Sequence, residues 1–120
     1  MKYMLLIYGN EELWSSFSQE DFQRAVADTD AQLAELAKSG ELVGAYGVGD
    51  QVLAKQVHVD NGVPAVTDGP YIETKEYLAS FTIIDVESLD RALEVAAKNP
   101  FAATGQVEVR PLMHEAAVDV

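Results

Sequence analysis

The clearest periodic pattern in the chain is an apolar stripe between residues 18 and 40, with members three and four residues apart. This spacing predicts one face of an amphipathic helix of about twenty residues. Ser18 is a good N-cap and Gly40 supplies the C-terminal stop. A second helix is expected to follow Ser88 and to end before Asn99-Pro100. The predicted buried stripes are Phe22, Val26, Thr29, Leu33 and Leu36 in the first helix, and Leu89, Ala92, Leu93, Ala96 and Ala97 in the second.

Strand patterns surround these two helices. Residues 2–8 are apolar on both faces, which is typical of a central strand covered on both sides. Residues 41–48 form a weaker strand, since Gly44 and Gly47 indicate a bulge or a close approach. Residues 77–86 and 106–112 are predicted to form two further strands. Residues 9–17, which hold the only tryptophan, are expected to be a loop.

Asn61-Gly62 predicts a hairpin between residues 55–60 and 63–68, because both residues tolerate the positive φ of a type I′ turn. A two-residue loop fixes the register, so Lys55 faces Asp68 as a possible ion-pair partner. Alternation places Asp68 on the same face as the strand valines and His58 on the opposite face.

The order β-α-β, hairpin, β-α-β predicts one α+β domain over residues 1–120, a ferredoxin-like split βαβ sandwich with an inserted β-hairpin. Both helices are expected on one face of the sheet. The other face keeps much apolar surface, and pairing two sheets across a two-fold axis would cover it. The pattern therefore predicts a homodimer.

Composition narrows the function classes. The 120 residues include 20 acidic and 8 basic side chains, a formal net charge of −12. Such a surface repels phosphate backbones, so no nucleic-acid partner is expected. The chain has no run of eighteen apolar residues, so no membrane span is predicted. The absence of cysteine is compatible with a cytoplasmic protein. We read the apolar start of the chain as a strand rather than a signal peptide.

The stretch 68–76 holds a turn-forming Asp68-Gly69-Pro70 and a run of charged residues. If two of its three carboxylates meet in a pocket, repulsion and desolvation raise the pKa of one toward neutrality, as a proton shuttle requires. We expect Asp68 to turn inward, toward a cavity shared with residues 73–76. The candidate catalytic residues are Asp68, Glu73 and His58, and the candidate substrate-binding residues are Lys75, Glu76, Arg110, Tyr8, Tyr71 and Ser80.

Each candidate also has a structural interpretation. Asp68 can cap the Gly69-Pro70 turn, Glu73 to Glu76 can form a solvated ion-pair cluster, and His58 can be an ordinary strand histidine. Aromatic residues can either line an apolar cavity or pack the core: Tyr3, Tyr8, Trp14, Tyr46, Tyr71, Tyr77 and Phe81. The sequence has no paired histidines or cysteines that would suggest a metal site, and it has no phosphate-binding loop. No cofactor is therefore predicted.

Several motifs together resemble the YCII-related (DGPF-domain) family over nearly the whole chain. They are Asp68-Gly69-Pro70-Tyr71, with tyrosine in place of phenylalanine, the opening residues 1–8, and the stretches 84–92 and 107–113. The resemblance implies a dimeric α+β barrel of ferredoxin-like subunits. It also implies that some relatives are enzymes with a His-Asp pair, although arginine is more usual at the position of His58 in this branch.

Two functions remain open from the sequence. One is an acid-base enzyme that binds a small molecule near the Asp-Gly-Pro loop. The other is a non-catalytic regulatory or ligand-sensing module that acts through protein contacts, for example with a sigma factor, to which the resemblance links some relatives.

Overall fold

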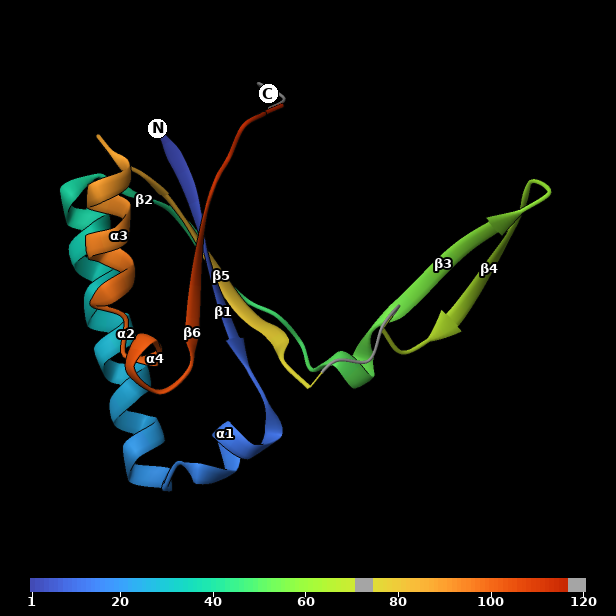
Figure 1. Ribbon diagram of the computed structural model, residues 1–120, viewed down its shortest axis with the longest axis horizontal. Helices are drawn as coiled ribbons and strands as arrows, with labels where there is room; N and C mark the ends of the chain where they lie inside the picture. Colours follow the sequence, from blue (N-terminus) through green and yellow to red (C-terminus); the bar gives the residue numbers. More distant parts are fainter. Residues whose placement is uncertain (71–74, 117–120) are drawn as a thin grey trace.

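The computed structural model describes residues 1–70 and 75–116, and shows a helix-covered sheet from which a two-stranded arm projects (Figure 1). The antiparallel sheet has the strand order β2-β5-β1-β6, which is the order of a ferredoxin-like split βαβ fold. Its strands are β1 (Lys2–Gly9), β2 (Leu42–Gly47), β5 (Tyr77–Asp85) and β6 (Gln106–Pro111). The predicted α+β architecture and the central place of the first strand are therefore confirmed.

Helices α2 (Gln19–Ser39) and α3 (Leu89–Ala97) cover one face of the sheet (Figure 1). The core lies between them and the sheet, and Ile84 is its fully buried centre. Strand register places Tyr3 opposite Ile84 and Leu5 opposite Thr82 on this inner face. Met4 and Leu6 alternate to the outer face, which no helix of the described residues covers (Figure 1).

The predicted caps of both long helices are present. The Ser18 hydroxyl accepts a hydrogen bond from the Asp21 backbone N–H at 3.0 Å, and the Ser88 hydroxyl accepts one from Arg91 N–H at 3.1 Å. Gly40 ends α2 in the left-handed conformation with a φ of 82°. These capping residues are strong sequence signals, because each one provides hydrogen bonds for backbone groups that a helix end leaves unpaired.

The predicted buried stripe of α3 is partly wrong. Ala92 and Ala96 are buried as expected, but Val95 joins them, whereas Leu89 and Leu93 are 49% and 47% exposed and Ala97 is exposed as well. Ala92, Val95 and Ala96 pack in the core cluster with Ile84, so the face of the helix that holds the two leucines is turned outward. In α2 only Leu36 is buried, whereas the other members of the predicted stripe are partly or well exposed in the single chain.

The expected loop over residues 9–17 is also wrong, because it contains the helix α1 (Glu11–Ser16). The Asn10 side chain caps this helix by accepting from Leu13 N–H at 2.6 Å. Trp14 packs over Gly9, where an added Cβ would lie only 2.1 Å from the indole ring. A further short helix, α4 (Phe101–Thr104), places Phe101 against the same indole, with ring centroids 5.9 Å apart.

The hairpin arm consists of β3 (Lys55–Asp60) and β4 (Val63–Asp68), preceded by the 3₁₀ turn η1 (Gln51–Leu53). Its register is the predicted one, with Lys55 opposite Asp68 and an ion pair between their side chains. Asn61 and Gly62 have φ values of 51° and 77°, as a type I′ turn requires. The arm leaves the sheet and reaches away from it, so both of its faces are exposed (Figure 1).

An ion pair between Arg91 and Glu41 links α3 to the residue that precedes β2. The Arg91 guanidinium donates to both carboxylate oxygens of Glu41, at 2.9 and 2.8 Å, and Ser39 adds a hydrogen bond of 2.8 Å. These hydrogen bonds, led by the one from Arg91, lower the pKa of Glu41 to about 2.

Candidate functional site

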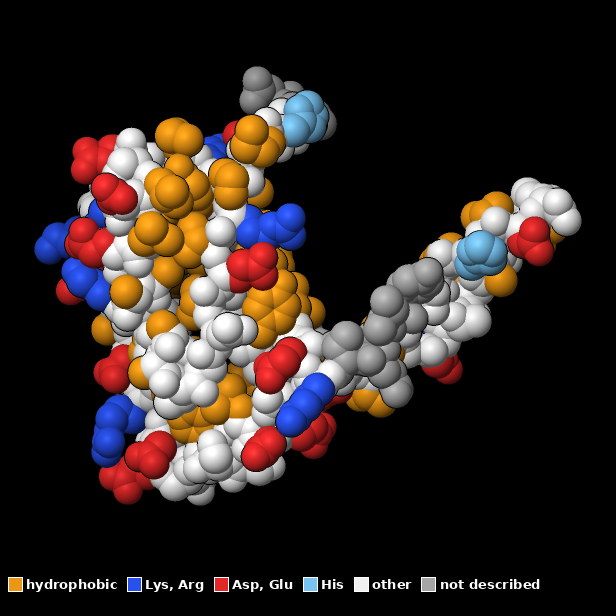
Figure 2. All heavy atoms as spheres, in the orientation of Figure 1, with side chains coloured by type: hydrophobic (Ala, Val, Ile, Leu, Met, Phe, Trp, Pro, Cys, Tyr) orange, Lys and Arg blue, Asp and Glu red, His pale blue; other side chains and the backbone are white. Residues whose placement is uncertain are grey.

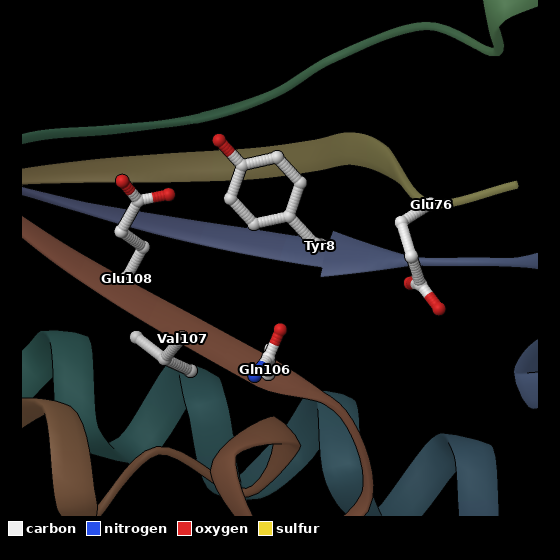
Figure 3. Close-up of a pocket in the computed structure, with 5 residues that line it drawn as sticks. All are labelled: Tyr8, Glu76, Gln106, Val107 and Glu108. Atoms are coloured by element: carbon white, nitrogen blue, oxygen red, sulfur yellow. The ribbon is translucent and has the colours of Figure 1, made fainter. Parts of the chain in front are cut away.

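A polar pocket of about 480 Å³ lies on the outer face of the sheet, where three parts of the chain meet (Figure 3). Tyr8 comes from the end of β1, Gln106 and Glu108 from β6, and Glu76 from the residue before β5. The β1–β6 register creates this grouping, because it pairs Tyr8 with Gln106 and Leu6 with Glu108. Residues far apart in the sequence therefore converge at one end of the sheet.

The Tyr8 phenol is the group whose ionisation the pocket changes. Burial raises the pKa of Tyr8, and the negative charge of Glu108 together with a hydrogen bond to Glu108 raises it further. The positive charge of Arg110 opposes this shift of the Tyr8 pKa. Arg110 Nε also lies 3.8 Å from Glu108 Oε1. The phenol thus stays protonated at neutral pH and donates toward a carboxylate.

Glu76 ties the pocket to α1. Its carboxylate accepts a hydrogen bond of 2.6 Å from the Asn10 side-chain amide, and Asn10 also caps that helix. The polar edge of the pocket is therefore held by the same residue that starts the neighbouring helix.

An apolar groove of about 410 Å³ adjoins the polar pocket, and Tyr8 and Glu76 line both. It lies between the end of the sheet and the base of the arm. Pro70 of the Asp-Gly-Pro turn forms part of its wall. The remaining lining residues are Val48, Gly49, Gln51, Ala54, Tyr77 and Leu78. Together the two cavities suit a ligand with an apolar body and a polar end, within the size range of small-molecule sites.

The structure brings together some of the candidate residues. Tyr8 and Glu76 line the pocket, and Arg110 lies beside it through its contact with Glu108. Ser80 instead lines two apolar cavities on the helix-covered side, together with Ile7. The predicted roles of these residues remain predictions.

The other described candidates lie outside this pocket. The Asp68 side chain is 84% exposed and pairs with Lys55, so the expectation that it turns into a cavity is wrong for the single chain. Its position explains this, because it ends an arm strand whose apolar face stays exposed, with Val66 64% exposed. Lys75 is exposed, with Nζ 3.8 Å from Glu12 Oε2, and His58 is exposed on the arm. Tyr71 and Glu73 lie outside the described residues.

Sequence reasoning missed Glu108 and Gln106. The alternation of residues 106–112 places Glu108 and Arg110 on one face of a strand, which is a signal that this face is polar. The pairing of β6 with β1 carries the rest of the information, and a single sequence does not specify it.

Two features are absent from residues 1–70 and 75–116, a cluster of metal-ligating side chains and a membrane-spanning helix. No group of three or more histidine, aspartate or glutamate side chains there is placed to hold a metal ion. None of the helices in that part of the chain has the length and apolar character needed to cross a membrane.

Comparison with known proteins finds a matching family model and a similar bacterial protein. A model of the YCII-related domain matches residues 1–116. Uncharacterized protein R00369 from Rhizobium meliloti (strain 1021) is 36% identical over 114 residues, covering 93% of this chain and 92% of that protein.

A solved structure shares the fold. It is 5-chloro-2-hydroxyhydroquinone dehydrochlorinase (TftG) from Burkholderia phenoliruptrix AC1100, in complex with 2,5-dihydroxybenzoquinone. The TM-score is 0.55 with 16% sequence identity, and the match covers 96% of each chain. The fold of this chain is thus that of the subunits of dimeric α+β barrels, as predicted.

Proposed function

The chain belongs to the YCII-related family, and from this premise we propose that it binds a small cyclic molecule bearing hydroxyl or carbonyl oxygens. The ring occupies the apolar groove beside Pro70, and its oxygens reach the polar pocket at Tyr8 and Glu108. The observation that carries the proposal is the convergence of a protonated phenol and two carboxylates beside an apolar groove of ligand size.

The charges of the pocket select the ligand class. The carboxylates of Glu76 and Glu108 accept hydrogen bonds and repel anions, so they favour a neutral ligand with hydroxyl donors. Arg110 balances part of this charge at one side only. The dehydrochlorinase with the same fold was solved with an oxygen-substituted ring, and this supports the proposed class.

The chemistry that fits this arrangement is proton transfer between carbon and oxygen of the ligand. Glu108 accepts a proton from a carbon next to a carbonyl, while Tyr8 donates its phenolic proton to the carbonyl oxygen, giving an enol. The proton on Glu108 then returns to Tyr8 through their hydrogen bond, so both residues regain their starting state. This tautomerisation requires no cofactor or second substrate.

The test uses 2-hydroxycyclohexanone, a neutral ring with one hydroxyl and one carbonyl, titrated into ¹⁵N-labelled protein. Chemical-shift changes are expected at residues 8, 76 and 106–108. Glu108→Gln and Tyr8→Phe are each expected to weaken binding by about tenfold, which corresponds to one lost hydrogen bond. The exposed Glu87→Gln is the matched control and should bind as the wild type does. Shifts confined to other regions, or an unaltered Glu108→Gln variant, would refute the pocket.

Catalysis is tested separately by deuterium exchange. In D₂O the protein should accelerate deuterium incorporation next to the carbonyl of the same probe, and Tyr8→Phe and Glu108→Gln should each remove most of the acceleration. Binding without acceleration would favour the alternative, a ligand-sensing module that uses the same pocket.

A further inference from the structure

A second cavity, apart from the polar pocket, lies on the helix-covered side of the sheet, and we call it the helix-side cavity. Its volume is about 400 Å³, which is within the size range of small-molecule sites. Strands β1 and β5 contribute the side chains of Ile7, Ala79 and Ser80 to its lining. The proposed function uses none of these three residues.

Three helices each contribute one aromatic ring to the helix-side cavity. The rings belong to Trp14 of α1, Phe22 of α2 and Phe101 of α4. The centroids of the Trp14 and Phe101 rings are 5.9 Å apart and the ring planes meet at 76°, so the two rings form walls at a steep angle rather than a stack. Phe22 is 44% exposed, and Figure 2 shows apolar side chains at the surface between α1 and α4. The aromatic cluster is therefore open to a ligand.

The indole of Trp14 is held from two sides. Its ring packs over Gly9, where an added Cβ would lie only 2.1 Å away, and its Nε1–H donates to the Tyr77 hydroxyl at 2.9 Å. An aromatic wall that is fixed before the ligand arrives loses little conformational entropy on binding. The helix-side cavity is thus preorganised.

The charge of the helix-side cavity is negative. Asp50 is the only acidic residue among the described residues that line it, and none of them is basic. The Asp50 carboxylate accepts a hydrogen bond of 2.9 Å from the Val52 backbone N–H, at the start of η1. Because a carboxylate has about four acceptor positions, this bond leaves it able to contact a ligand as well. The formal net charge of −12 attracts cations to the protein as a whole.

We propose that the helix-side cavity binds a small organic cation, an ammonium group that carries methyl or other alkyl substituents. Aromatic ring faces attract a cation, most strongly where water is excluded, and aromatic cages suit substituted ammonium groups for this reason. The alkyl substituents pack against Ile7 and Ala79, and Asp50 balances the positive charge. An anion meets no positive side chain among the described lining residues.

This cavity adjoins the groove of the proposed function but selects a different ligand. Val48 and Tyr77 line both cavities. The groove leads to the polar pocket and takes a neutral ring with oxygen substituents, whereas the helix-side cavity takes a cation. The inference therefore goes beyond the proposed function and does not rest on it.

A matched pair of ligands tests the preference for a cation. Choline carries a trimethylammonium group, and 3,3-dimethylbutan-1-ol has the same shape without the charge. In isothermal titration calorimetry of the full chain, choline should bind about tenfold more tightly than the neutral alcohol. In ¹⁵N-labelled protein, choline should shift the resonances of residues 14, 22, 50, 80 and 101.

A matched pair of variants tests the role of Asp50. Asp50→Asn removes the charge but keeps a side-chain oxygen that can cap η1, and it should weaken choline binding about tenfold. Binding of the neutral alcohol should change by less than about twofold. Asp60→Asn makes the same change in net charge at the exposed tip of the arm, which reaches away from the sheet (Figure 1), and should leave choline binding unchanged. Far-ultraviolet circular dichroism checks that both variants remain folded.

Four outcomes would overturn the proposal. They are a wild-type protein that does not bind choline, equal affinity for choline and the neutral alcohol, equal losses in Asp50→Asn and Asp60→Asn, and choline-induced shifts confined to residues 8, 76 and 106–108. The third would assign the attraction to overall charge, and the fourth would assign choline to the polar pocket. Failure of 2-hydroxycyclohexanone to bind would refute the proposed function alone, and the result for choline would stand.

Discussion

The helix-covered sheet, here called the body, and the hairpin arm are both built from β-strands. Apolar strand residues are buried in the body and exposed in the arm. In the body, Ile84 is completely buried in the core between the sheet and helices α2 and α3. In the arm, Val57 and Val66 have the same chemistry and lie opposite each other, but are 66% and 64% exposed. An alternating pattern therefore specifies which residues share a face, whereas the layer that covers that face comes from elsewhere.

The largest difference between the two regions is expected for removal of an apolar side chain. Ile84→Ala leaves a cavity in the fully packed body and should lower the free energy of unfolding by about 3–4 kcal/mol. Val63→Ala, on the face of the arm opposite to that of Val66, should change it by less than about 0.5 kcal/mol. Urea denaturation followed by circular dichroism measures both. Equal losses would mean that the arm and the body unfold as one packed unit.

Each region has an ion pair, and we expect the Glu41–Arg91 pair of the body to stabilise the fold more than the Lys55–Asp68 pair of the arm. Glu41→Gln removes the charge that Arg91 binds with two hydrogen bonds, and should lower the thermal midpoint at pH 7 by about 5 °C. The folded pKa of Glu41, about 2, lies below its ordinary value of 4.5. Its contribution is therefore fully present above pH 4.5 and is lost as the pH falls toward 2.

Thermal melts across this pH range test the prediction for Glu41. The gap between wild type and Glu41→Gln should be widest near neutral pH and should close toward pH 2. Glu87→Gln, on an exposed residue without a resolved partner in the described chain, is the control and should follow the wild type. A gap that stays constant down to pH 2 would contradict a lowered pKa.

The smallest effect is expected for the ion pair of the arm. Lys55 and Asp68 are 63% and 84% exposed, so water and salt screen their attraction. Lys55→Ala should reduce the free energy of unfolding by less than about 1 kcal/mol. Urea denaturation at low and high salt checks this value, and a larger loss that salt does not reduce would show that the pair is buried against another surface.

Local signals made much of the fold predictable. Ser18 and Gly40 bound a helix through their own backbone geometry, and Asn61-Gly62 sets a register that no distant contact is needed to define. The sequence predictions were wrong where tertiary packing determines which residues are buried. Val95 is buried in place of Leu93 because it is the face of α3 with Ala92, Val95 and Ala96 that packs in the core, and helical spacing alone does not determine which face does so.

The candidate site was less predictable for the same reason. Tyr8 and Glu76 were named from the sequence and do line one pocket, because they lie at adjacent ends of paired strands. Glu108 was missed, since its proximity to Tyr8 depends on the pairing of the first and last strands. Asp68 drew attention as part of a motif, but its side chain lies on the arm, outside the pocket that its own turn helps to shape.

The single tryptophan has a practical consequence. The Trp14 indole N–H donates to the Tyr77 hydroxyl at 2.9 Å, and Tyr77 also lines the apolar groove next to Glu76. Intrinsic fluorescence at the red edge of excitation thus originates from one place in each molecule, beside the groove. Any compound that displaces water from around Tyr77 should change the emission of this natural reporter without a label.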